Sequence, residues 1–174
     1  MITWIDNSPK VIISSEIEFS SSEFDRCEHL LSGYVDTDGI FHGRMKSFGV
    51  DRGDIKIEPN ISVSKHARSK VGAFHITVAS FESILKNTTL TDDEHAYIFK
   101  EANNSSVSGF LVYRDSLRVM PYGRDDNDFF EIEARRSKNA GMYHYSNRNI
   151  FGRVILTSDQ NKNLRDKAGR EGFI

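Results

Sequence analysis

The sequence lacks the features that build disulfide frameworks, flexible linkers and membrane spans. Its 174 residues include a single cysteine, Cys27, and only three prolines. One cysteine excludes an internal disulfide framework and is typical of a reducing compartment. No apolar run approaches the roughly 20 residues that a helix needs to cross a bilayer, and the N-terminus lacks the basic-then-apolar order of a signal peptide. These absences predict a soluble, cytoplasmic protein with no membrane partner.

The length and the even composition indicate one domain over residues 1–174. A chain of this size buries about 70% of the surface that its unfolded form exposes, so it can hold a core without a disulfide or a metal. No internal repeat, low-complexity tract or linker rich in proline or glycine divides it.

Two capping boxes, one from Ser20 to Glu23 and one from Thr91 to Glu94, predict helices that begin there. The apolar faces expected of these helices are Phe24, Cys27, Leu30 and Leu31 in the first, which would end at Gly33, and Ala96, Phe99 and Ala102 in the second.

Alternating apolar residues predict the strands, which are expected over 10–19, 39–50, 54–63, 70–81 and 149–158. The pair Asp115-Ser116 between two apolar runs predicts a β-hairpin, and a short helix is expected over 128–138. Two capped helices and a mostly antiparallel sheet predict an α+β fold, with a two-layer arrangement that places the helices on one face of the sheet.

The side chains that usually carry chemistry are scattered. None of the histidines has the spacing of a metal site. His42 and His75 could meet across neighbouring strands, but two ligands make no metal site, so satisfied sheet histidines are favoured. Cys27 is interpreted as a packing residue. No nucleotide-binding or nucleophile motif is present, so we expect no cofactor, no metal and no activity in the isolated chain.

Charge is uneven along the chain, although the net charge is only −2. Residues 125–133 are acidic but lack the spacing of a calcium loop. They form either an exposed loop or, less favoured, a nuclease site that uses Asp125, Asp126 and Asp128. Residues 135–170 carry a clear basic surplus, which is either a solvated face or a surface that attracts phosphates.

Arginines flank the predicted hairpin. Arg114 and Arg118 lie on either side of its turn, and Arg135 and Arg136 follow a short distance later. Arginines exposed in this way either grip nucleic acid or a carboxylate, or only keep the surface soluble.

The segment over 107–174 resembles the second domain of GHKL ATPases, the superfamily of gyrase B, heat-shock chaperones, MutL and MORC proteins. The resemblance rests on the strand "YRDSLRVMPYG", an acidic-aromatic segment, an Arg-Arg pair, the strand "GRVIL" and a closing "REG" loop. It implies a transducer domain with the topology of the second domain of a small-ribosomal-subunit protein. That topology includes a βαβ crossover that is left-handed, against the general preference.

In these ATPases a loop of the transducer domain places a cation on the γ-phosphate of ATP bound in the neighbouring domain. The chaperone branch has Asn-x-Ser-Arg-Glu, and this chain has Lys167, Gly169, Arg170 and Glu171 at the matching positions. The resemblance therefore implies that Arg170, with Lys167 as a second candidate, contacts the γ-phosphate. It also implies that residues 159–174 form a mobile sensor loop, with Phe173-Ile174 beginning a further helix.

The resemblance implies a part of a larger ATPase that couples ATP binding to conformational change. The motifs that hold adenine and Mg²⁺ are absent here, so ATP and Mg²⁺ would belong to a preceding nucleotide-binding domain, which is the expected partner. A homodimer is also compatible with this class. The alternative function is a nucleic-acid-binding module that uses the basic 135–170 stretch, with DNA as its partner and Arg114, Arg118, Arg135 and Arg136 as interface candidates.

Overall fold

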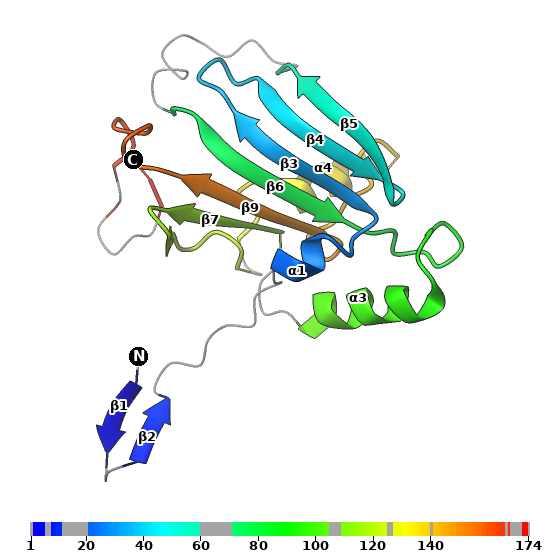
Figure 1. Ribbon diagram of the computed structural model, residues 1–174, viewed down its shortest axis with the longest axis horizontal. Helices are drawn as coiled ribbons and strands as arrows, with labels where there is room; N and C mark the ends of the chain where they lie inside the picture. The colour runs from blue at the N-terminus through cyan, green and yellow to red at the C-terminus, as the bar shows by residue number, and fades with distance from the viewer. Residues whose placement is uncertain are drawn as a thin grey trace.

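The computed structural model describes residues 2–5, 8–11, 21–59, 71–104, 109–124, 127–139, 141–165, 167 and 172–173. Its strands are β1 (Ile2–Ile5), β2 (Ser8–Val11), β3 (His29–Val35), β4 (Phe41–Ser47), β5 (Val50–Ile57), β6 (Phe74–Ser80), β7 (Gly109–Arg114), β8 (Leu117–Arg118) and β9 (Ile150–Leu156). Its helices are α1 (Ser21–Phe24), α3 (Asp92–Asn104) and α4 (Ile132–Lys138) (Figure 1).

Most of the strands belong to one mixed sheet. β1 and β2 pair only with each other, and the 7-stranded sheet has the order β5-β4-β3-β6-β9-β7-β8. Neighbouring strands in this sheet are antiparallel, except that β7 and β9 are parallel. The prediction of an α+β fold with a mostly antiparallel sheet is therefore confirmed.

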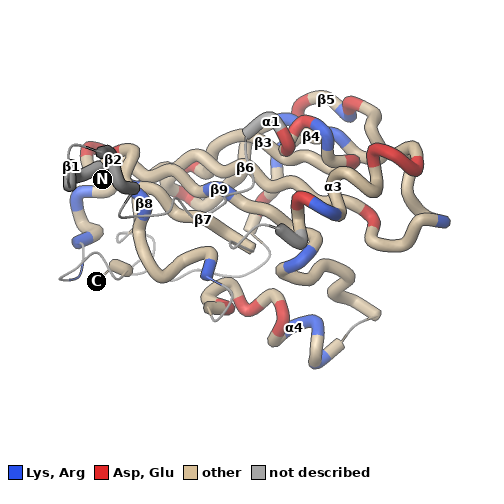
Figure 2. Tube along the Cα trace, turned by 90° about the horizontal axis from the view of Figure 1, so that it is seen from below, with Lys and Arg blue, Asp and Glu red and all other residues tan. Residues whose placement is uncertain are grey.

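The parallel pair requires a crossover connection, which contains β8 and α4. In Figure 1 both strands of the pair point to the left, β9 lies above β7, and α4 lies behind the sheet. Figure 2, seen from below, also places α4 on that side of the sheet. This path makes the crossover left-handed, whereas nearly all such connections are right-handed.

Apolar clusters cover both faces of the sheet. Phe151 of β9 pairs directly with Ala79 of β6, so their side chains share one face. Val154 of β9 pairs with Val112 of β7 and points to the opposite face. The first cluster adds Phe24, Cys27, Phe81 and Ile98, and the second adds Val119, Tyr122 and Leu156. α1 and α3 thus pack on one face of the sheet, while the segment leading into α4 covers the other face.

The first predicted helix is largely wrong. The helix expected over 20–33 is reduced to α1, which ends at Phe24, and β3 begins at His29. Leu30 and Leu31, expected on one helical face, are successive residues of a strand and point to opposite faces of the sheet. β3 is hydrogen-bonded to β4 on one side and to β6 on the other, and these tertiary bonds outweigh the local preference for helix.

Gly33 does not end a helix but lies in the middle of β3, opposite Gly43 of β4. A Cβ atom at Gly33 would lie 2.1 Å from the carbonyl oxygen of His42. Glycine is needed here because the two backbones approach closely.

The second capping box is confirmed at the start of α3. The backbone N and the hydroxyl of Thr91 donate to Oε2 of Glu94 at 2.9 and 2.8 Å, and the backbone N of Glu94 donates to Oγ1 of Thr91 at 3.4 Å. These bonds, the backbone one foremost, lower the pKa of Glu94. The cap fixes where the helix begins, as its sequence indicated.

The buried face of α3 differs from the expected one. Its buried residues are His95 and Ile98, whereas Ala96 and Phe99 are exposed. His95 turns inward because its Nε2 donates to the carbonyl oxygen of Glu82 at 2.9 Å. A buried histidine therefore sets the orientation of the helix, which the apolar pattern alone did not show.

Most of the remaining element predictions agree with the structure. The strands expected over 39–50, 70–81 and 149–158 are β4, β6 and β9, and the short helix expected over 128–138 is α4. The strand expected over 54–63 is confirmed only in part, because β5 spans Val50–Ile57 and residues 58–59 are not in a strand. Residues 60–63 of that prediction lie outside the described residues, as do residues 12–19 of the strand expected over 10–19. The hairpin is confirmed, with Asp115 and Ser116 at φ 48 and 67, as a type I′ turn requires.

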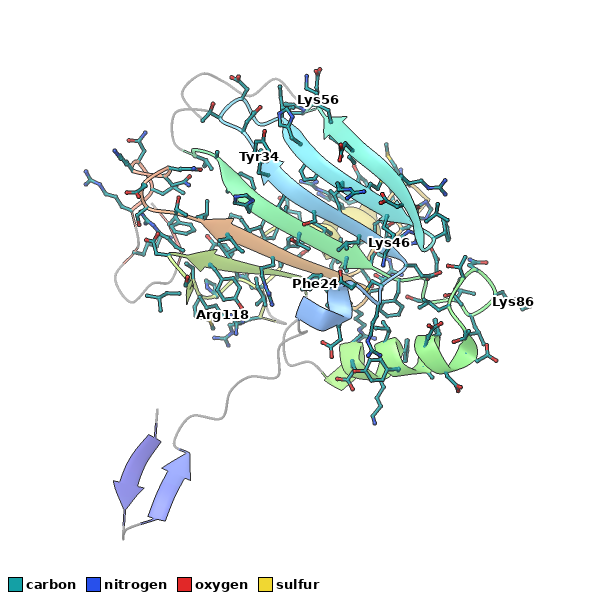
Figure 3. The ribbon with its side chains drawn as sticks, viewed as in Figure 1. Phe24, Tyr34, Lys46, Lys56, Lys86 and Arg118 are labelled. Atoms are coloured by element: carbon teal, nitrogen blue, oxygen red, sulfur yellow. The ribbon has the colours of Figure 1, made fainter. Side chains whose placement is uncertain are left out.

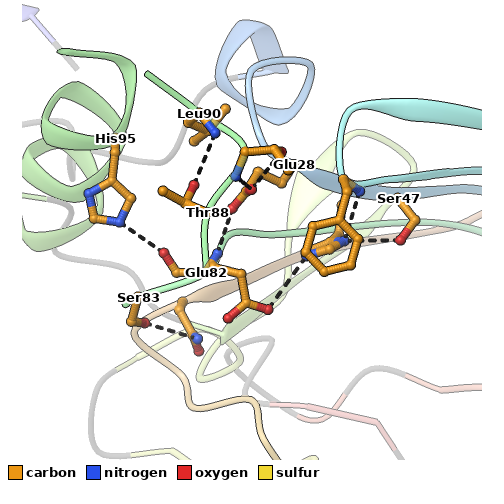
Figure 4. Close-up of polar contacts among 11 residues, drawn as sticks. Glu28, Ser47, Glu82, Ser83, Thr88, Leu90 and His95 are labelled. Atoms are coloured by element: carbon orange, nitrogen blue, oxygen red, sulfur yellow. Dashed lines mark hydrogen bonds and ion pairs between the residues drawn. The ribbon is translucent and has the colours of Figure 1, made fainter. Parts of the chain in front are cut away.

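Glu28 is a buried charge that ties the start of β3 to the segment before α3 (Figure 4). Its side chain is among the least exposed in the described chain, at 1%. The carboxylate accepts hydrogen bonds from the backbone N of Glu82 at 2.9 Å and from the backbone N and hydroxyl of Thr89 at 2.5 and 2.8 Å. Burial alone would raise the pKa of Glu28, but these bonds to the charged form outweigh it and hold the pKa below its ordinary value.

We expect Glu28→Gln to lower the free energy of unfolding at neutral pH by about 1.5–3 kcal/mol, the usual contribution of hydrogen bonds to a charged group. Because the folded-state pKa lies below the unfolded one, the stabilisation is complete above the unfolded pKa. It is lost as the pH falls through the folded pKa. Urea unfolding from neutral pH down to about pH 3 measures both effects. Glu58→Gln, at an exposed ion pair with Lys56, is the control and should change little. An equal deficit of Glu28→Gln at both ends of the pH range would contradict the prediction.

Cys27 is 1% exposed, and burial raises the pKa of its thiol to about 12. The thiolate is the reactive form of cysteine. We therefore expect a thiol reagent to leave the folded protein unlabelled at mildly alkaline pH and to label it fully in denaturant. Labelling of the folded protein as fast as the unfolded one would show that Cys27 is not the packing residue that its burial indicates.

Candidate functional site

The candidate site is the closing loop, defined as residues 157–173, of which the structure describes 157–165, 167 and 172–173. The loop leaves the sheet at the end of β9. Because β7 is parallel to β9, the turn that follows β7 lies at the same end of the sheet (Figure 1).

The hairpin turn holds the start of the closing loop. Asp115 accepts a hydrogen bond at Oδ1 from the backbone N of Ser158 at 2.9 Å, and its Oδ2 accepts one from the Ser158 hydroxyl. Nε of Arg114 donates to the same hydroxyl at 3.2 Å. The backbone N of Asp115 donates to the carbonyl oxygen of Leu156 at 3.1 Å. Arg114, predicted as an interface residue, is thus part of the loop's support.

Asn161 anchors the middle of the closing loop. It is 1% exposed. Its Oδ1 accepts a hydrogen bond from the backbone N of Gly72 at 2.8 Å, and its Nδ2 donates to the carbonyl oxygens of Ala73 and Thr157 at 3.0 and 3.2 Å. A fully bonded, buried amide fixes the loop against the start of β6.

Phe173 packs on the second core cluster at the far end of the closing loop. Its ring stacks on Tyr122 with centroids 6.2 Å apart, and Cζ of Arg114 lies 5.8 Å from the Phe173 centroid. Burial raises the pKa of Tyr122, although a hydrogen bond from the backbone N of Phe173 to its hydroxyl acts in the opposite direction. Phe173 is therefore held by the domain itself. The mobility of 159–174 stays a prediction.

The described cations of the loop face outward while these anchors face inward. Lys162, Arg165 and Lys167 are exposed, and Leu164 packs on the second cluster. The backbone N of Lys167 donates to the carbonyl oxygen of Gly172 at 3.0 Å, which closes the end of the loop. Arg170, the first candidate for the γ-phosphate contact, lies outside the described residues. The described part of the loop can present positive charge on a fixed support.

The predicted interface arginines fall into two separate groups. Arg118 lies beside β7, near the closing loop, and its Nη2 is 3.5 Å from the carbonyl oxygen of Tyr122 (Figure 3). Arg135 and Arg136 lie on α4, which both Figure 1 and Figure 2 show well apart from the C-terminal end. The basic stretch 135–170 therefore does not form one continuous surface.

Asp128 does not support the nuclease interpretation. Its carboxylate accepts hydrogen bonds from the backbone N of Ile132 at 2.8 Å and of Ala134 at 2.9 Å, which caps α4. Burial would raise the pKa of Asp128, but these bonds hold it below its ordinary value. Asp125 and Asp126 lie outside the described residues. Among the described residues, no group of three or more His, Cys, Asp or Glu side chains could hold a metal ion.

His42 and His75 do not meet, because β3 separates their strands. Tyr34 of β3 lies between them, with ring centroids 5.1 Å from His42 and 6.3 Å from His75. Nε2 of His42 lies 2.8 Å from Oδ2 of Asp36, and this hydrogen bond is the main reason that the pKa of Asp36 is lowered. The interpretation of His42 as a satisfied sheet histidine is confirmed, and the disfavoured alternative, in which His42 and His75 meet across neighbouring strands, is excluded.

Sequence reasoning missed Tyr122 and Asn161 as supports of the loop. Tyr122 stands within the segment "YRDSLRVMPYG" and Asn161 within 159–174, but neither belongs to a motif that indicates its role. Their partners lie far away in the sequence, so no local spacing could reveal them.

Comparison with known proteins finds no family model, curated protein or solved structure that matches this chain. The likeness to GHKL ATPases therefore rests on the sequence motifs. Within the part of the chain that the structure describes, none of the helices has the length and apolar character needed to span a membrane.

Tyr122→Ala removes both the ring and the hydroxyl that hold Phe173. We expect it to lower the free energy of unfolding by about 3–5 kcal/mol, as for other buried aromatic residues, and to speed hydrogen exchange across the closing loop. Tyr122→Phe keeps the ring and should cost about 1 kcal/mol. Hydrogen exchange followed by mass spectrometry measures the second effect. Unchanged exchange in the closing loop of Tyr122→Ala would show that this contact does not hold it.

Proposed function

We propose that this chain is the transducer domain of a GHKL-type ATPase. In this proposal the closing loop supplies a cation to the γ-phosphate of ATP bound in a preceding domain. The observation that carries the proposal is the way in which this loop is anchored to the sheet and exposes cations. Buried anchors fix it to the sheet, and its described cations, Lys162, Arg165 and Lys167, are exposed. The left-handed crossover between β7 and β9 also agrees with the topology that the resemblance implies.

The chemistry asked of this chain is electrostatic. Negative charge develops on the transferring phosphate, and a cation held in a fixed position stabilises it most effectively. Arg170 offers a planar guanidinium that can bind two oxygens, and Lys167 offers a point charge. ATP and Mg²⁺ would be held by the preceding domain, and this chain would contribute only the loop cations.

The anchors of the closing loop suggest how ATP binding would be coupled to movement. A cation drawn to the phosphate moves the loop, and the loop is bonded to the β7–β8 turn through Asp115 and to the start of β6 through Asn161. A movement of the loop towards the phosphate would therefore be transmitted through these bonds to the strands of the sheet.

Arg170→Ala is the direct test, made in a protein that joins this chain to its nucleotide-binding domain. We expect ATP turnover to fall by about 10³–10⁵-fold, the usual cost of losing a phosphate-directed arginine, with nucleotide affinity nearly unchanged. Arg165→Ala is the matched control, because Arg165 is an exposed cation of the same loop outside the matched motif. Turnover at the parental rate in Arg170→Ala would refute the role of this residue.

Nucleic-acid binding is the second candidate function, and one observation favours it. The side chains of Arg135 and Arg136 on α4 are about half exposed, at 55% and 48%. They lie away from the closing loop, so the two functions would use different surfaces of the same domain. Binding that weakens steeply as salt rises would be its signature.

A further inference from the structure

α4 and the loop that follows it expose both cations and tyrosines. We call this the tyrosine–arginine surface. Its members are Arg135, Arg136, Lys138, Tyr143, Tyr145 and Arg148. All of them are exposed, and Figure 2 shows α4 as a feature that stands off from the sheet.

The loop 141–148 folds back along α4. At one end, the backbone N of Tyr143 donates to the carbonyl oxygen of Asn139, the C-cap of α4, at 3.0 Å. At the other end, the backbone N of Asn147 donates to Oε1 of Glu133, within α4, at 2.7 Å. The tyrosines therefore lie on a segment whose backbone is bonded at both ends to the helix that carries the cations.

Further bonds fix this loop to the rest of the domain. The carbonyl oxygen of Asn147 accepts a hydrogen bond from the backbone N of Gly109 at 3.3 Å. Nδ2 of Asn149 donates to the hydroxyl of Ser83 at 3.2 Å, and Oδ1 of Asn149 accepts from the backbone N of Ser146 at 2.8 Å. The surface is thus positioned in advance of any partner, which lowers the entropy cost of binding.

Large side chains are exposed on this anchored loop. Tyr143 is 40% exposed, Tyr145 43% and Met142 69%. Aromatic rings dominate the burial in cores and interfaces. Rings held outward by an ordered backbone are therefore available for a partner.

The charge of the surface is positive. Residues 131–149 contain Arg135, Arg136, Lys138 and Arg148 against Glu131 and Glu133, so four positive and two negative charges leave a net charge of +2. The ion pairs that the arginines of α4 form are long, at 3.5 Å from Arg135 to Glu131, the N-cap, and 3.9 Å from Arg136 to Glu133. Such exposed pairs contribute little and can be exchanged for phosphate contacts.

We propose that the tyrosine–arginine surface binds single-stranded nucleic acid, with bases stacked on Tyr143 and Tyr145 and phosphates held by Arg135 and Arg136. The inference rests on the second candidate function and specifies its ligand. Rings beside cations are the combination that binds single strands without sequence preference. Bases within a duplex are stacked on one another and cannot stack on protein rings, so the tyrosines favour the single strand.

The test measures binding of a labelled oligothymidylate and of a labelled duplex to the full chain, by fluorescence anisotropy at low and rising salt. We expect the single strand to bind more tightly than the duplex. Tyr143→Ala and Tyr145→Ala should each weaken it by about 5- to 100-fold, the effect of removing one stacking ring. The double variant Arg135→Ala/Arg136→Ala should weaken the binding of both probes. For the single strand, it should also reduce the slope of log affinity against log salt by about 1.4, because two phosphate contacts are lost.

Matched controls separate stacking from general effects. Tyr143→Phe and Tyr145→Phe keep the rings and should bind as the parent does. Tyr34→Ala removes a ring that is 44% exposed on the main sheet and should leave binding unchanged (Figure 3). Circular dichroism confirms that each variant is folded.

Three results would overturn the inference. Equal binding of single strand and duplex, unaffected by the tyrosine variants, would remove the stacking role but keep nucleic-acid binding as a function. Absence of binding to either probe at low salt would remove that function as well. Self-association that the tyrosine variants abolish, with no effect of oligonucleotide, would identify the surface as a contact between two copies of the chain.

Discussion

The parallel pairing of β7 with β9 is the constraint on which the rest of the structure depends. Parallel neighbours cannot be joined by a tight turn, so the chain must cross the sheet between them. The crossover brings Val119 and Tyr122 onto one face as core residues and places α4 behind the sheet. The same pairing sets the Asp115 turn beside the end of β9, where it can hold the closing loop.

The positively charged surfaces of the domain lie on separate parts of the structure, because apolar side chains cover both faces of the sheet between them. β9 contributes Phe151 to one cluster and Val154 to the other, so both faces are covered with apolar side chains around this strand. Of the basic stretch 135–170, the described exposed cations lie on the closing loop at one end of the sheet and on α4 and the loop after it behind the sheet, whereas Arg153 lies within β9. A stretch that is uniformly basic in sequence is therefore divided into two surfaces, and each can serve a different partner.

Local patterns predicted the elements whose cause is local. The alternation in 74–80 and the hydrogen bonds of the Thr91 cap are set by residues close in sequence, and both agree with the structure. Residues 20–33 also fit a helical pattern, but β3 forms because its partners are β4 and β6. That error also hid the strand that separates His42 from His75. In the site, the exposed Lys167 could be named from a motif, whereas Asn161 could not, because its bond to Gly72 spans 89 residues.

The amide of Asn161 touches two places at once, the approach to β6 and the exit from β9. These two strands are neighbours in the interior of the sheet, not at its margin. Asn161 therefore joins the closing loop to the ends of two paired interior strands. A displacement of the loop at this residue would act on both strands together, and through Phe151 and Val154 of β9 it would reach both apolar clusters.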